Sequence, residues 1–255
     1  MSSIWTRRAA DLSPRLQGGI AVVTGAGSGI GRAIAVEAAR QGMRLTLVDV
    51  SPEGLDGTRA ALAPDTIIST SVADVRRAAD LQAVAAGLSE APVLVFANAG
   101  VLARGPLTTQ PAEELERMLS INVMGALNTV QAFAPAMLKA DLPSRIVITG
   151  SQASFAAFDG IGGYSASKHA VLAIVRSLAQ EWTGTSLSAA MLAPGGVETP
   201  IVGSNPSGAR LMAPAEAAAI AFAGAVDGRL LISTHSDLAG MVAARNRGLE
   251  QALQS

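Results

Sequence analysis

Short apolar runs alternate with longer, alanine-rich stretches along most of this chain. The short runs are rich in β-branched residues and poor in charge, which is typical of strands buried on both faces of a parallel sheet. Seven runs are therefore predicted to be strands, at Ile20–Thr24, Leu45–Asp49, Thr66–Thr70, Val93–Ala97, Arg145–Thr149, Leu187–Leu192 and Arg229–Ser233.

The longer stretches between these runs have the pattern of helices. We predict helices at Ile30–Gln41, Pro52–Leu62, Arg76–Leu88, Pro111–Lys139, Tyr164–Trp182 and Pro214–Val226, with a further one at Leu238–Leu253 near the C-terminus. Repeated alternation of strand and helix predicts the α/β class, with an open, doubly wound parallel sheet covered by helices on both faces.

The chain has 255 residues, of which 49% are hydrophobic and 15% charged, so it is long enough to bury one large core. We expect one domain over residues 18–255. Residues 1–17 have no strong pattern and are expected to form an N-terminal arm that is poorly ordered. The segment Val202–Gly208 is rich in Gly, Ser, Asn and Pro, and is either an ordinary connection or a small flexible lid.

Composition argues against several kinds of protein. The net charge is −1 and aromatic residues make up only 3%, so we expect no nucleic-acid surface. There is no cysteine and there are only two histidines, so we expect neither disulfides nor a metal site. We see no signal-peptide pattern and no run of about 18 apolar residues, so the expectation is a cytoplasmic protein without membrane contact.

A glycine-rich turn follows the first predicted strand, as Thr24-Gly25-Ala26-Gly27-Ser28-Gly29-Ile30-Gly31. It departs from the G-x-G-x-x-G spacing, because Ile30 stands where the last Gly or Ala would be. The same physics nevertheless applies, since glycines allow close backbone approach and amides at a helix N-terminus can face a pyrophosphate. Taken alone, such a turn can equally be a plain connection.

Asp49 closes the second predicted strand, 24 residues after Gly25. An acidic residue near this offset accepts hydrogen bonds from the adenosine ribose, although an Asp here can also be a helix cap. Val50 and Ser51 follow, so no basic residue stands beside Asp49 to receive a 2′-phosphate, which Asp49 would repel. The predicted cofactor is therefore NAD rather than NADP.

Tyr164 is the only tyrosine, and Lys168, one of two lysines, lies four residues later on the same predicted helix. Side chains four apart share a helix face, so the ammonium can approach the phenol. A phenol has a pKa of about 10, and a neighbouring positive charge favours the phenolate, which predicts a base near neutral pH. An ordinary surface pair is the alternative.

Together with further motifs, these features resemble the short-chain dehydrogenase/reductase family in its compact single-domain form. The resemblance runs in order from about Ile20 to Thr199 and rests on Thr24-Gly25-x-x-x-Gly29-Ile30-Gly31, Asn98-Ala99-Gly100, Asn122, Ser151, Tyr164-x-x-x-Lys168 and Pro194-Gly195-Gly196-Val197-Glu198-Thr199. It implies a Rossmann-type sheet of about seven strands in the order 3-2-1-4-5-6-7.

The resemblance also implies roles for individual residues. Those expected to bind the cofactor are Gly25, Ser28, Gly29, Ile30, Gly31, Asp49, Asp74, Val75, Asn98, Ala99, Gly100, Tyr164, Lys168, Pro194, Gly195, Val197 and Thr199. Ser151, Tyr164, Lys168 and Asn122 are the expected catalytic residues. Ser151 hydrogen-bonds the substrate oxygen, Tyr164 moves its proton, Lys168 supports Tyr164 and binds the nicotinamide ribose, and Asn122 holds a water at a helix irregularity.

These roles imply an NAD-dependent oxidoreductase that interconverts a secondary alcohol and a ketone. The alternatives are an epimerase or dehydratase on the same scaffold, or a dinucleotide sensor without turnover. A serine hydrolase is a poor alternative, because Ser151 is not in a G-x-S-x-G elbow.

Two features bear on the substrate and on assembly. The expected substrate pocket comprises Gln152, Ala153, Phe155, Phe158, Gly195, Gly196 and the segment Ile201–Leu211, and its phenylalanines favour an apolar or aromatic alcohol or ketone. Relatives often carry a Gly-Gly element after the last strand, where this chain has Thr234-His235-Ser236-Asp237. This difference leaves a homodimer and the usual homotetramer both open.

Overall fold

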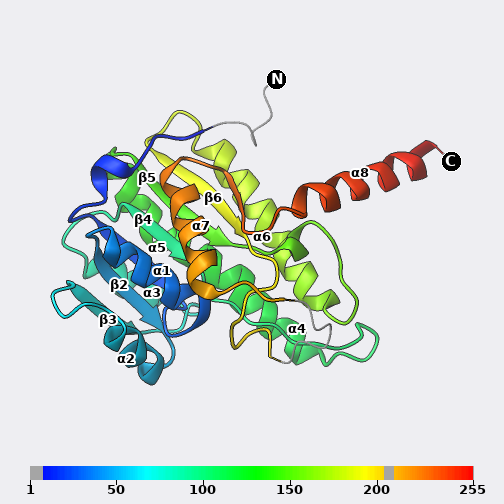
Figure 1. The fold of residues 1–255 in the computed structure, drawn as a ribbon, viewed down its shortest axis with the longest axis horizontal. Helices are drawn as coiled ribbons and strands as arrows, with labels where there is room; N and C mark the ends of the chain where they lie inside the picture. Colours follow the sequence, from blue (N-terminus) through cyan, green and yellow to red (C-terminus); the bar gives the residue numbers. More distant parts are fainter. Residues whose placement is uncertain (1–7, 204–209, 255) are drawn as a thin grey trace.

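A computed structural model describes residues 8–203 and 210–254 of the chain. Seven strands form one sheet in the order β3-β2-β1-β4-β5-β6-β7, and every neighbouring pair is parallel (Figure 1). The predicted fold class and strand order are confirmed. The strands are β1 (Ile20–Thr24), β2 (Arg44–Asp49), β3 (Ile68–Val72), β4 (Leu94–Ala97), β5 (Ser144–Thr149), β6 (Leu187–Ala193) and β7 (Leu231–Ser233).

Helices cover both faces of this sheet. They are α1 (Gly29–Arg40), α2 (Pro52–Ala60), α3 (Ala78–Ala86), α4 (Ala112–Leu119), α5 (Gly125–Ala140), α6 (Gly162–Glu181), α7 (Pro214–Val226) and α8 (Leu238–Gln254), with short 3₁₀ turns at Ser13–Arg15 and Gln152–Ser154. The first and seventh helices pack together on one face, whereas α3 packs beside α5 on the other.

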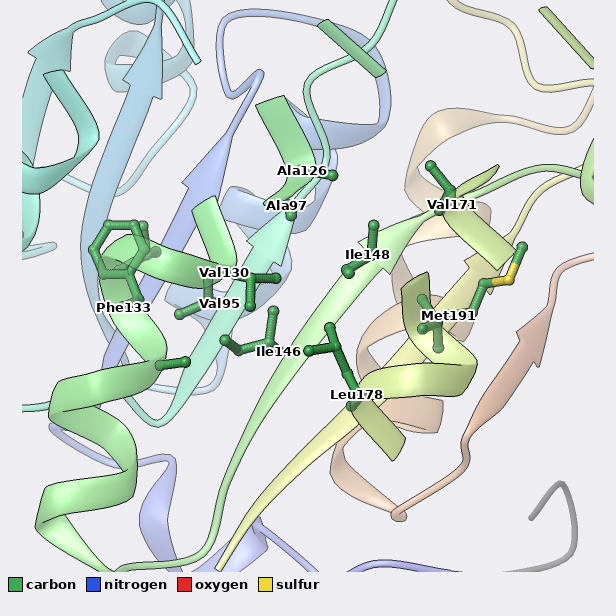
Figure 2. Packing of buried hydrophobic residues seen from close by; sticks show 14 of the residues in the cluster. Val95, Ala97, Ala126, Val130, Phe133, Ile146, Ile148, Val171, Leu178 and Met191 are labelled. Carbon is green, nitrogen blue, oxygen red and sulfur yellow. The ribbon is translucent and has the colours of Figure 1, made fainter. Parts of the chain in front are cut away.

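Except in the edge strand β3, alternate residues of the strands belong to two separate hydrophobic clusters. Ile146 and Ile148 of β5 point into the cluster shared with α5 and α6, while Val147 between them joins the cluster shared with α1 and α7. Figure 2 shows the first cluster, with Val130 of α5 and Leu178 of α6 against the strands. This arrangement explains why the strands read as continuous apolar runs, since both of their faces are buried.

The long helix predicted at Pro111–Lys139 is interrupted. It is formed by α4 and α5 joined through a π-helical segment, Ser120–Met124, which keeps the chain helical but widens one turn. Asn122 lies in that segment and is almost fully buried. Its side chain donates to the Val101 carbonyl (2.9 Å) and to Ser167 Oγ (3.0 Å), and accepts from the Val101 amide (2.8 Å). These bonds hold a polar side chain inside the protein at the irregular turn.

Part of the expected N-terminal arm packs on the domain. Residues 1–7 lie outside the described residues, but Leu12 and Leu16 are buried in the cluster that contains α1 and α7. The Leu12 amide donates to the Val226 carbonyl (3.2 Å), and Arg145 Nη2 donates to the Ala10 carbonyl (3.0 Å). Residues 8–17 therefore extend the core. Of the segment Val202–Gly208, expected to be either a connection or a lid, residues 204–208 lie outside the described residues.

The last helix, α8, projects from the body of the molecule (Figure 1). Leu238 at its start is buried, and Arg245 Nη1 donates to the Phe155 carbonyl (3.1 Å), but Leu249 and Leu253 further along are exposed. Whether a second copy covers these residues is not tested, so the oligomeric state stays a prediction. None of the helices in the described ranges is long and apolar enough to cross a bilayer.

Candidate active site

One cavity of about 970 Å³ opens where the strands end. Residues one or two positions after each of the seven strands line it, which is where open parallel sheets bind their ligands. The cavity joins the glycine-rich turn at one end to Ser151 and Tyr164 at the other. Its walls therefore bring together residues that are far apart in sequence.

The glycine-rich turn fits a bound pyrophosphate. Gly25 has a φ of +66°, and a Cβ there would come within 2.8 Å of Ala99 Cα, so a side chain is excluded. Ser28 at the start of α1 makes no side-chain cap bond to the described residues, which leaves the amides of the first turn available to an anion. Gly31 does not line the cavity; a Cβ at this position would overlap the Gly25 carbonyl oxygen.

Asp49 ties the end of β2 to this turn. One of its carboxylate oxygens accepts from the Gly27 amide (2.8 Å) and the other from the Ser51 amide (3.0 Å), and the side chain also lines the cavity. Arg32 of α1 donates to Thr58 Oγ1 (3.0 Å) and does not line the cavity. Negative charge, rather than positive charge, thus faces the ligand at Asp49.

The adjoining wall is built from the ends of β3 and β4. Asp74 and Val75 line the cavity, and Arg76 Nε donates to Asp74 (2.8 Å), which holds the pKa of that carboxyl below its usual value. Asn98 Nδ2 donates to the Thr24 carbonyl (3.2 Å). This bond fixes the spacing between the two strands on either side of the expected cofactor path.

Ser151, Tyr164 and Lys168 meet at the far end of the cavity. Ser151 follows β5, and its hydroxyl is hydrogen-bonded to the Tyr164 side chain. Lys168, one turn after Tyr164 on α6, donates from Nζ to the Thr149 carbonyl (2.8 Å) and lies 5.5 Å from the centroid of the Tyr164 ring. The helix thus presents both side chains to the end of β5.

The acid–base properties of the pair differ from the expectation. Burial raises the pKa of Tyr164 to about 12, and the hydrogen bond with Ser151 opposes this rise. Burial also lowers the pKa of Lys168 to about 8. The expectation of a Tyr164 phenolate near neutral pH is therefore wrong for this structure, because desolvation of the phenol outweighs the influence of a cation that lies over the ring and bonds to a carbonyl.

Asn122 lies behind the catalytic side chains and does not line the cavity. A Cβ on Gly100 would be 3.3 Å from Asn122 Oδ1 and 3.5 Å from Lys168 Nζ, so both atoms face the space that this glycine leaves without a side chain. The side chain of Asn122 is occupied by Val101 and Ser167. It can position the segment near Lys168, while its role in a water relay stays a prediction.

Most of the other expected site residues line the same cavity. They are Ser28, Gly29, Ile30, Asn98, Ala99, Gly100, Gln152, Ala153, Phe158, Pro194, Gly195, Gly196, Val197 and Thr199, with Ile201, Val202, Arg210 and Leu211 from the expected pocket segment. Phe155 does not; it is buried in the core cluster against α5 and α6, so its assignment to the substrate pocket is wrong.

Several cavity residues are absent from the site predicted from the sequence, and His235 and Asp237 are two of them. They follow β7 directly, at the same edge of the sheet as the other site residues. No motif marks them. Their position just after a predicted parallel strand was the one signal that could have identified them.

Comparisons with known proteins agree with this geometry. A family model described as short chain dehydrogenase matches residues 19–209. A 1-deoxy-11-beta-hydroxypentalenate dehydrogenase of Streptomyces avermitilis is 35% identical over 73% of this chain and 71% of its own length. A levodione reductase of Leifsonia aquatica is 34% identical over 72% of this chain and 71% of its own.

A solved structure is also similar. It is a short chain dehydrogenase/reductase from Burkholderia phymatum in complex with NAD, which superposes with a TM-score of 0.84 at 31% identity, over 93% of this chain and 96% of that one. The range 19–209 that the family model matches spans the turn, Asp49, Ser151, Tyr164 and Lys168. The chain belongs to the short-chain dehydrogenase/reductase family.

Proposed function

We propose that this protein is an NAD-dependent oxidoreductase that interconverts a secondary alcohol and a ketone, with Tyr164 as the acid and base. The observation that carries the proposal is the meeting of Ser151, Tyr164 and Lys168 in the cavity that also contains the glycine-rich turn. Relatives named as a hydroxypentalenate dehydrogenase and a levodione reductase support the same class of reaction.

When bound, NAD accepts a hydride from the alcohol carbon, and NADH returns one to the ketone. The remaining steps belong to side chains of this chain. Ser151 and Tyr164 bind the substrate oxygen, and Tyr164 takes its proton during oxidation or supplies one during reduction. The protonated Lys168 side chain stabilises negative charge on the phenol. Lys168 becomes neutral above a pH of about 8.

The preference for NAD rests on Asp49. Its carboxylate lines the cavity beside the turn, so it can accept hydrogen bonds from ribose hydroxyls and would repel a 2′-phosphate. Arg32 bonds to Thr58 and to the Gly27 carbonyl and does not line the cavity, so its guanidinium is not presented to a 2′-phosphate there. The NAD complex of the similar Burkholderia phymatum protein supports the assignment.

The test is an activity screen with both cofactors. The protein is incubated with NAD or NADP and a panel of apolar and aromatic secondary alcohols, and formation of the reduced nicotinamide is followed by absorbance. We expect turnover with NAD and weaker turnover with NADP. Stronger turnover with NADP would contradict the assignment of Asp49. NAD binding without turnover on any alcohol or ketone would favour the sensor over the enzyme.

A further inference from the structure

We propose that His235 forms a subsite for a second, neutral oxygen of the substrate, so that the preferred substrates are diols and their hydroxyketone products. This inference rests on the proposed function, because it names the substrate class of the same site. Oxidation of one carbinol transfers a hydride to NAD and a proton to Tyr164, and the second hydroxyl keeps its proton. That second hydroxyl is the group that His235 binds.

The hydrogen bonds around His235 decide which ring nitrogen carries the proton. The Gly195 amide lies 3.2 Å from Nδ1 and 3.3 Å from Thr234 Oγ1, and this hydroxyl lies 2.7 Å from Nδ1. The Gly195 N–H donates to Nδ1, so this nitrogen accepts, and the Thr234 hydroxyl beside it then donates to the same nitrogen. Two donors thus meet Nδ1, which must carry a lone pair, and the proton of the neutral ring is on Nε2.

The rest of the ring is also fixed in place. It packs over Gly195, where a Cβ would come within 2.8 Å of Nδ1 and 2.9 Å of Cγ. His235 is partly exposed and lines the cavity, and Nε2 has no hydrogen-bond partner in residues 8–203 or 210–254. A donor with a fixed orientation therefore remains for a ligand in the cavity.

One peptide group connects this donor to the catalytic serine. The Pro194 carbonyl accepts from Ser151 Oγ (3.5 Å) and from the Gln152 amide (2.9 Å), while the Gly195 amide on the opposite side of the same planar peptide bonds to His235. The rigid Pro194–Gly195 peptide group thus fixes the position of His235 relative to Ser151. A substrate whose first oxygen is bound at Ser151 can present its second oxygen to the same wall.

The neighbours of His235 indicate what kind of oxygen fits. Gln152 Nε2 donates to Asp237 Oδ1 (2.6 Å), and both residues line the cavity with His235. Their carbonyl and carboxylate oxygens accept hydrogen bonds, whereas His235 Nε2 donates one. A hydroxyl can both donate and accept, so it matches this wall, and the charge of Asp237 disfavours a carboxylate at the same place.

Two substitutions distinguish the roles of the two ring nitrogens of His235. In His235→Asn, the amide oxygen can replace Nδ1 as the acceptor for Gly195, but no donor reaches the position of Nε2. We expect the ratio of kcat/KM for butane-2,3-diol to that for butan-2-ol to fall about 10-fold, as loss of one hydrogen bond predicts. In His235→Gln, the amide nitrogen can take the place of Nε2, and the ratio should recover to within about 3-fold of the original.

His169→Gln is the matched control, because His169 lies on α6, bonds to the Ser165 carbonyl (2.9 Å) and does not line the cavity. It should leave the ratio unchanged. Should His235→Asn reduce the two kcat/KM values by the same factor, or neither of them, the subsite does not exist and His235 acts only on the Gly195 peptide.

A binding measurement keeps the subsite testable apart from turnover. In the His169→Gln protein, His235 is the one remaining histidine, so ¹⁵N-histidine NMR of the NADH-loaded protein reports on it alone. At mildly alkaline pH we expect the Nε2-protonated form, and a shift of Nε2 with butane-2,3-diol but not with butan-2-ol. A diol-specific shift without turnover would support the subsite and contradict the proposed dehydrogenase activity. A ring protonated on Nδ1, or no shift, would overturn the subsite.

Discussion

The ammonium of Lys168 lies 5.5 Å from the centroid of the Tyr164 ring while it donates to the Thr149 carbonyl. Both groups therefore titrate in a desolvated site. Burial raises the pKa of Tyr164 to about 12 and lowers that of Lys168 to about 8. Below a pH of about 8 the pair carries two protons, and above it one, which can sit on either group.

This titration predicts opposite pH profiles for the two directions. Oxidation needs a phenolate beside an ammonium, which is one form of the singly protonated pair, so log kcat/KM should rise with pH and level off above about 8. Reduction needs the doubly protonated pair and should be constant at low pH and fall above the same value. Profiles of kcat/KM in both directions check this, and a single profile shared by both directions would refute it.

Lys168→Met is predicted to stabilise the protein while it reduces activity. At pH 7 the buried ammonium carries a desolvation cost, and its removal should raise the free energy of unfolding by about 2 kcal/mol after loss of the bond to Thr149. Between pH 8 and 10.5 the unfolded chain binds a proton that the folded chain does not, so the wild-type protein becomes more stable and the difference shrinks.

Urea unfolding at several pH values measures this difference. Lys139→Met is the control, because Lys139 is the other lysine and is exposed at the end of α5. It should change the free energy of unfolding little. If Lys168→Met destabilises the protein at pH 7 as well, the ammonium is better solvated than its lowered pKa implies.

Asn122→Ala is predicted to destabilise the protein by about 2 kcal/mol, because it leaves the part-buried amide and carbonyl of Val101 without their partner. Ser120→Ala removes a hydroxyl from the same π-helical segment and should cost far less, since that hydroxyl is exposed. Thermal unfolding of the two variants compares them directly. If both variants lose the same amount of stability, the hydrogen bonds between Asn122 and Val101 do not contribute to it.

Asp49→Asn is predicted to narrow the preference for NAD over NADP. Asn retains an acceptor oxygen for the Gly27 amide but removes the charge that repels a 2′-phosphate. We expect the ratio of the two Kd values to fall by about 10-fold, chiefly through tighter binding of NADP. Calorimetry with both cofactors measures it. An unchanged ratio, with NAD affinity intact, would show that the charge of Asp49 does not select the cofactor.

The sequence pattern was sufficient to predict the strands of the sheet, because buried parallel strands are apolar on both faces. It did not reveal the π-helical segment, since Ser120–Met124 remains helical and keeps the apolar pattern of its flanks. Phe155 and Phe158 could not be distinguished either, because the turn after β5 sends one into the core and the other to the cavity. The motifs identified Ser151 and Tyr164, whereas His235 has a place in the site only through the folded sheet.

The most direct test of the account is single-turnover hydride transfer in Tyr164→Phe, measured together with the Kd for NAD. We expect the rate of NADH formation from a secondary alcohol to fall by about 100-fold or more, as for loss of a general base, while the Kd for NAD changes by less than about 3-fold. An unchanged rate of hydride transfer in this variant would contradict the central claim that Tyr164 moves the substrate proton.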